Sequence, residues 1–68
     1  MAAGHQFDLP YSVELWDEND NQVEELLALT ADYGVARAAY EEAVKRRPGR
    51  IVTLRRTTRV LADSRRKG

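Results

Sequence analysis

Four arginines, Arg50, Arg55, Arg56 and Arg59, have the residue type and spacing best suited to a chemical task in this sequence. They lie on and beside a stretch with the pattern of a β-hairpin, and a basic run at residues 45–47 precedes them. Guanidinium groups bind phosphates and carboxylates through paired hydrogen bonds. A two-stranded ribbon is also slim enough to enter a DNA major groove. The cluster is compatible with binding to nucleic acid, with binding to an acidic protein, and with a solvated basic edge that discourages pairing with other strands.

Catalytic and metal-binding patterns are missing from the sequence. His5 is the only histidine and there is no cysteine, whereas a metal site needs three or four converging ligands. No nucleophile elbow, dinucleotide-binding fingerprint or phosphate loop is present. A chain of 68 residues also offers little concave volume for a small-molecule substrate. We expect no catalytic residue, no metal, no cofactor and no enzymatic activity.

The net charge of zero conceals two oppositely charged halves. Residues 1–44 contain ten of the eleven acidic residues and a single basic one, so they sum to −9, and residues 45–68 sum to +9. Such asymmetry is the strongest compositional signal in the chain. The acidic half would repel a phosphate backbone, and the sequence pI of about 6.6 is far from the value above ~9 that is typical of nucleic-acid-binding domains.

The element that we expect to organise the domain is one amphipathic helix over residues 21–47. Asn21 suits the N-cap because Glu24 follows three residues later, as in a capping box. Gly34 costs about 1 kcal/mol in a helix interior, but the apolar stripe keeps its phase across it, which favours one continuous helix. Pro48 ends the helix. The stripe predicted to face the core is Leu26, Leu29, Tyr33, Ala36, Tyr40, Ala43 and Val44.

Strands are predicted on both sides of this helix. Residues 11–17 alternate with period two, which places Tyr11, Val13 and Leu15 on one face and Ser12, Glu14 and Trp16 on the other. A hairpin follows the helix, with strands at residues 50–55 and 60–63 and a turn over 56–59. Its inward pair is Val52 and Leu54.

The expected fold class is α+β, in the order βαββ. Val60, Leu61 and Ala62 are consecutive and apolar, which is typical of a strand with neighbours on both sides. The last strand is therefore predicted at the centre of a three-stranded sheet, antiparallel to both neighbours, with the helix on one face. Residues 11–64 form the domain, residues 1–10 a mobile N-terminal segment and residues 65–68 a basic tail.

Two surfaces are candidates for contact with another protein. A second stripe of small residues, opposite the core stripe, would let another helix approach closely, and a core this small gains from forming a homodimer. The open sheet face offers Trp16 and Ile51, and Trp16 with Arg55 on that face would also suit base stacking. The residues of the small stripe are Ala28, Ala31, Val35 and Ala38.

The chain resembles short uncharacterised bacterial proteins. The resemblance rests on LWDE at residues 15–18, ARAAYEEAVKRRPGR at 36–50, VTLR at 52–55 and RVLADS at 59–64. These proteins are similar over most of the chain and have a glycine in the hairpin turn where this sequence has Thr57 and Thr58. The resemblance implies no activity, cofactor or catalytic residue.

The sequence as a whole predicts a small non-enzymatic interaction module. No apolar run approaches the ~18 residues of a membrane span, and the N-terminus lacks the pattern of a signal peptide, so we expect a cytoplasmic protein with no membrane contact. Association with protein, either a second copy or an acidic partner of the arginine-rich hairpin, is the leading hypothesis. Nucleic-acid binding through the same hairpin is the alternative.

Overall fold

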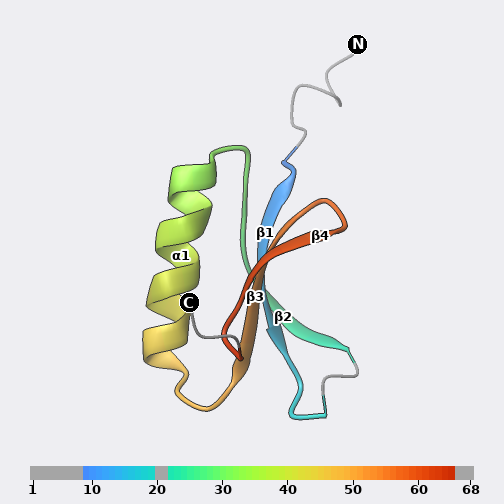
Figure 1. The fold of residues 1–68 in the computed structure, drawn as a ribbon, viewed down its shortest axis with the longest axis vertical. Helices are drawn as coiled ribbons and strands as arrows, with labels where there is room; N and C mark the ends of the chain where they lie inside the picture. The colour runs from blue at the N-terminus through green and yellow to red at the C-terminus, as the bar shows by residue number, and fades with distance from the viewer. Residues whose placement is uncertain (1–8, 20–21, 66–68) are drawn as a thin grey trace.

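The computed structural model describes residues 9–19 and 22–65. These residues form one helix that packs on one face of a four-stranded antiparallel sheet (Figure 1). The strand order in the sheet is β2-β1-β3-β4. The α+β class is as predicted, but the sheet has one strand more than expected. The elements are β1 (Tyr11–Trp16), β2 (Val23–Thr30), α1 (Tyr33–Arg46), β3 (Ile51–Arg56) and β4 (Arg59–Asp63).

The additional strand, β2, occupies residues predicted to be the first half of the helix, and that prediction is wrong. Glu, Leu and Ala favour a helix by intrinsic propensity, but here they pair with β1 along its whole length. The backbone N–H of Asp17 donates to the carbonyl of Gln22 at 3.1 Å and helps to close the β1–β2 hairpin. Tertiary pairing therefore outweighs local propensity. The predicted N-cap, Asn21, lies outside the described residues.

Helix α1 begins beside Gly34, the glycine that the sequence analysis placed in the interior of one continuous helix. Asp32 is its N-cap, and the Asp32 carboxylate accepts from the Val35 N–H at 3.0 Å. Gly34 therefore lies in the first turn and not in the interior. The predicted end is confirmed, because the helix stops at Arg46, just before Pro48. Gly49 completes the stop with a φ of 81°, a left-handed value that suits glycine.

The hydrophobic core lies between α1 and the two central strands. The inward faces predicted for β1 and β3 are confirmed, since Val13, Val52 and Leu54 are fully buried. Leu26 and Leu29 were assigned to the same core by the helix interpretation, but both are about half exposed on β2. The core consists of Val13, Leu15, Ala36, Tyr40, Ala43, Val52 and Leu54.

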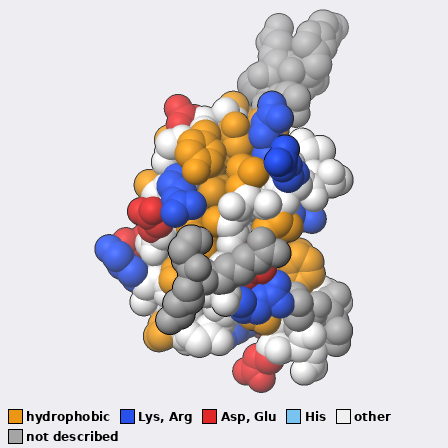
Figure 2. Space-filling view, in the orientation of Figure 1, with side chains coloured by type: hydrophobic (Ala, Val, Ile, Leu, Met, Phe, Trp, Pro, Cys, Tyr) orange, Lys and Arg blue, Asp and Glu red, His pale blue; other side chains and the backbone are white. Residues whose placement is uncertain are grey.

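Strand β4 is at an edge of the sheet and not at its centre, where the sequence predicted it. Its only neighbour among the described strands is β3, and α1 packs mainly against β1, β2 and β3. Leu61 has no residue opposite it on β3 and forms a β-bulge. The apolar run Val60, Leu61 and Ala62 is therefore part of an irregular edge strand. Hydrophobic side chains consequently reach the surface between α1 and the β3–β4 hairpin (Figure 2).

The turn of the β3–β4 hairpin carries a strained residue. Its two central residues are Thr57 and Thr58, and Thr57 has a φ of 55°, which a β-branched side chain rarely adopts. We expect Thr57→Gly to stabilise the protein by about 1 kcal/mol in urea denaturation, because the strain of such a residue is of order 1–3 kcal/mol. Thr58→Gly is the control, since the φ of Thr58 is not positive. Equal destabilisation by both variants would contradict the assignment of strain to Thr57.

Candidate functional site

The face of the sheet opposite α1 carries three rows of side chains. Residues directly opposite each other on neighbouring strands share a face. Because Val13 and Leu15 point toward α1, their neighbours Ser12, Glu14 and Trp16 point away from it. We call the residues in these rows the open face. From β2 to β4 the rows are Leu29, Ser12, Arg55 and Val60; Leu26, Glu14, Thr53 and Asp63; and Val23, Trp16 and Ile51.

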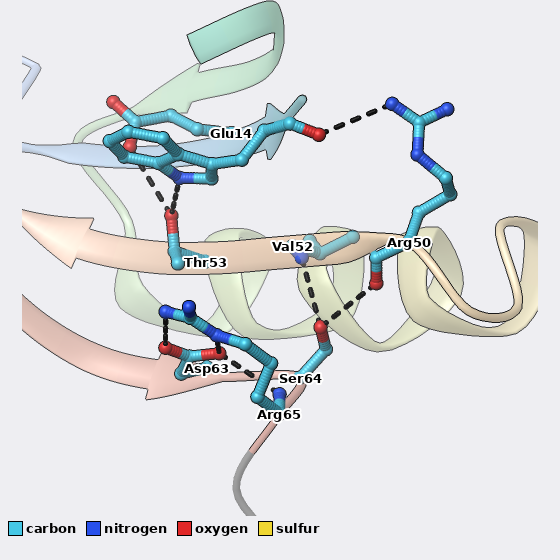
Figure 3. Close-up of polar contacts among 8 residues, drawn as sticks. Glu14, Arg50, Val52, Thr53, Asp63, Ser64 and Arg65 are labelled. Atoms are coloured by element: carbon cyan, nitrogen blue, oxygen red, sulfur yellow. Dashed lines mark hydrogen bonds and ion pairs between the residues drawn. The ribbon is translucent and has the colours of Figure 1, made fainter. Parts of the chain in front are cut away.

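The middle of the open face is a hydrogen-bonded polar cluster (Figure 3). Glu14 is only 6% exposed, and its carboxylate accepts from Arg55 at 2.7 Å and from the Thr53 hydroxyl at 3.3 Å. The Thr53 hydroxyl accepts in turn from the Trp16 indole N–H at 2.8 Å. Ser12 also donates to Glu14, at 3.4 Å. The Glu14 carboxylate is thus held by partners on its own strand and on β3, which suits a structural role.

A second buried carboxylate, Asp63, lies at the β4 end of the middle row (Figure 3). Arg65 donates to it from its backbone N–H at 2.9 Å and from its guanidinium at 2.5 and 3.0 Å. The neighbouring Ser64 hydroxyl accepts from the Val52 N–H and donates to the Arg50 carbonyl. Arg65 was predicted to belong to a basic tail, but its guanidinium is paired with the sheet. Residues 66–68 lie outside the described residues.

The four candidate arginines do not form one cationic surface. Arg50 pairs with Glu24 and also donates to the Trp16 carbonyl at 3.2 Å, and Arg55 pairs with Glu14. Both pairs join the basic half of the sequence to the acidic half. Part of the charge segregation is therefore explained by ion pairs between segments that come from the two halves.

The other two arginines flank the hairpin turn on the opposite side of the sheet from Arg55. The Arg56 guanidinium lies 5.9 Å from the centre of the Tyr11 ring, and Arg59 is directly opposite Arg56. Neither arginine forms an ion pair with a carboxylate in the described part of the chain. These two are the cations of the predicted cluster that remain available to a ligand.

The outer face of α1 is occupied by local ion pairs. Arg37 pairs with Glu41 at 3.0 Å, and Arg46 pairs with Glu42 at 2.7 Å. The hydrogen bond from Arg46 lowers the pKa of the Glu42 carboxyl, and the hydrogen bond to Glu41 raises the pKa of Arg37. Burial raises the pKa of the Tyr40 hydroxyl, which faces the core. Ion pairs between residues four positions apart, such as these two, are typical of a solvated helix surface.

The predicted stripe of small residues is not a helix face, so that prediction is wrong. Ala28 is in β2 and packs against the core, and Ala31 lies between β2 and α1. Only Val35 and Ala38 are on α1, where both are exposed. In contrast, Trp16 and Ile51 do lie directly opposite each other on the open face, although both are partly buried.

Exposed aliphatic side chains on β2 are the feature that sequence reasoning missed. Val23, Leu26 and Leu29 are 39%, 52% and 49% exposed, and all three belong to the open face. Val60 adds a fourth on the opposite edge. The capping aspartate Asp32 and the turn-forming run at residues 17–21 were the signals that could have placed a strand here.

The described residues offer no strong candidate for a small-molecule or metal site. A shallow groove of about 340 Å³ between β2 and α1 is at the small end of ligand pockets, and it is lined by residues of both charges, including the paired Glu42 and Arg46. No group of three or more potential metal ligands occurs among residues 9–19 and 22–65. Over the same residues, no helix is long and apolar enough to cross a membrane.

Comparison of the chain with protein-family models, with curated proteins and with solved structures finds no match. The resemblance to short bacterial proteins stays a prediction.

Proposed function

We propose that this domain is a small, non-enzymatic protein-association module of the cytoplasm, and that its contact surface is the edge strand β2 with its exposed aliphatic side chains. The observation that supports the proposal most directly is the set of exposed aliphatics Val23, Leu26 and Leu29 on β2. Contiguous apolar patches on a soluble domain are typical of surfaces that bind another protein.

Photo-crosslinking tests this proposal even when the identity of the partner is unknown. We expect a photo-reactive phenylalanine at Leu29 to give a protein adduct in cells that express the chain, and the additional substitution Leu26→Ser to abolish it. The matched control is the same photo-reactive residue at Val35, which is 56% exposed on the other side of the molecule. Adducts of equal yield from both positions, or none from Leu29, would contradict the proposal.

Nucleic-acid binding ranks second, because two of the four arginines are already neutralised by Glu24 and Glu14. A phosphate-binding role would therefore rest mainly on Arg56 and Arg59. We expect fluorescence anisotropy with mixed DNA and RNA oligonucleotides at low salt to show no binding beyond a weak, salt-sensitive background. Tight binding by the wild-type chain that Arg56→Glu with Arg59→Glu removes would establish the alternative instead.

A further inference from the structure

Strand β2 is an eight-residue edge strand that is only partly protected against pairing with another strand. Its only neighbour among the described strands is β1, so one side of its backbone has no pairing strand. Edge strands are commonly protected by short length, charged side chains, proline or bulges. β2 is the longest of the described strands and contains neither lysine nor proline, and its protection consists of Glu24, Glu25 and the bulges at Glu24 and Leu27. The other edge, β4, is shorter and begins with an arginine.

The side chains of β2 are compatible with one antiparallel self-pairing register. Because of the two bulges, the open-face residues recur every third position, at Val23, Leu26 and Leu29. Two copies of a strand must place residues of the same face opposite each other. Val23, Leu26 and Leu29 all lie opposite an open-face residue of the other copy in one register only. In that register Leu26 of one copy faces Leu26 of the other, and Val23 of each copy faces Leu29 of the other.

The glutamates of β2 also fit this register. With Leu26 on the two-fold axis, Glu24 faces Ala28 and Glu25 faces Leu27, so no two carboxylates are opposed. A shift that centres the axis on Glu25 would place two glutamates face to face, which is destabilising.

We infer that the partner of β2 is a second copy of this chain, added edge to edge through antiparallel β2 strands with the two-fold axis at Leu26. This inference rests on the proposed function and names its partner. The two four-stranded sheets join into one eight-stranded sheet, and six aliphatic side chains form a continuous band across the junction. Edge pairing of this length is a small interface, so the dimer is expected to be weak.

Position 26 gives a test specific to a residue on the symmetry axis. We expect sedimentation equilibrium to show a dimer for the wild-type chain, and Leu26→Glu and Leu26→Lys each to weaken dimerisation at least about tenfold, since each variant opposes like charges. A one-to-one mixture of the two variants should recover the dimer. Both substitutions are at an exposed position, and circular dichroism checks that the fold is retained.

Val60→Glu is the matched control, because Val60 has a similar exposure on the same face but lies on the opposite edge strand. If the dimer forms through β2, the Val60→Glu variant stays dimeric in sedimentation equilibrium. Amide hydrogen exchange should also show concentration-dependent protection in β2 and none in β4.

Three results in solution, besides the crosslinking result below, would overturn the inference: a monomeric wild-type chain at several hundred micromolar, a dimer that Val60→Glu disrupts, or a mixture of the charge variants that stays monomeric. The proposed function fails separately, when the crosslinker at Leu29 gives no specific adduct. An adduct with a mass other than about twice 7.7 kDa keeps the proposed function and overturns the inference.

Discussion

Leu54→Ala is expected to lower the free energy of unfolding by about 2–5 kcal/mol. Leu54 is fully buried on β3 and packs within the core cluster under α1. Its truncation removes apolar contacts and leaves a cavity. A domain of this size has a total stability of roughly 3–10 kcal/mol, so the variant loses a large fraction of its stability. Urea denaturation followed by the fluorescence of Trp16, the only tryptophan, measures the change.

Leu29 provides the matched control for this experiment. The helix interpretation places Leu29 in the core and requires Leu29→Asp to abolish cooperative unfolding. In the structure Leu29 is 49% exposed on β2, so Leu29→Ala should change the unfolding free energy by only about 0.5 kcal/mol. Leu29→Asp should retain a cooperative transition. If the Leu29 variants lost as much stability as Leu54→Ala, the placement of β2 would be wrong.

Glu14→Ala is expected to cost about 2–3 kcal/mol, the second largest effect. The substitution removes the acceptor of Arg55 and of the Thr53 hydroxyl, and it leaves a largely buried guanidinium without its partner. Breaking a fully buried ion pair typically costs about 3–5 kcal/mol. The Arg55 side chain is 30% exposed, so solvent screening reduces that cost.

A double-mutant cycle separates the pair from its surroundings. Replacing both partners, as in Glu14→Leu with Arg55→Met, should recover most of the lost stability, because it leaves no buried charge unpaired. Breaking the exposed pair Arg37–Glu41 with Glu41→Ala is the control and should cost less than about 0.5 kcal/mol. Strictly additive effects of the Glu14 and Arg55 substitutions in urea denaturation would show that their ion pair contributes nothing.

The parts of the fold that the sequence predicted correctly are those whose periodicity has one interpretation. The alternation of residues 11–16 and the inward pair Val52 and Leu54 correctly predicted β1 and β3. The second half of the predicted helix was also right, because Ala36, Tyr40 and Ala43 are buried on α1.

The missed strand had an ambiguous pattern. In β2 the bulges move the open-face residues to a spacing of three, and Leu26 and Leu29 therefore continue the helical stripe of α1 by coincidence. Periodicity alone does not distinguish a twice-bulged strand from a helix turn. The helix-favouring composition of residues 23–30 added to the error.

The sequence identified the arginines of the candidate site but not the carboxylates with which they pair. Arg50 and Arg55 were predicted to bind an external anion, but in the structure both pair with carboxylates of the same chain. Trp16 and Arg55 do share a face of the sheet. The carboxylates that pair with the two arginines, Glu24 and Glu14, lie 26 and 41 positions away in the sequence. Such distant pairings depend on sheet topology, which the predicted order of strands did not contain.

The ion pairs across the sheet have a consequence for the chain before it folds. The acidic hairpin β1–β2 comes from one half of the sequence and the basic hairpin β3–β4 from the other, and they meet where β1 pairs with β3. Two segments of opposite charge attract each other in the unfolded ensemble, within a screening length of about 8 Å at physiological salt. This attraction favours compact conformations in which the two hairpins are close together. The charge pattern therefore lowers the entropic cost of the most distant contact in the sheet.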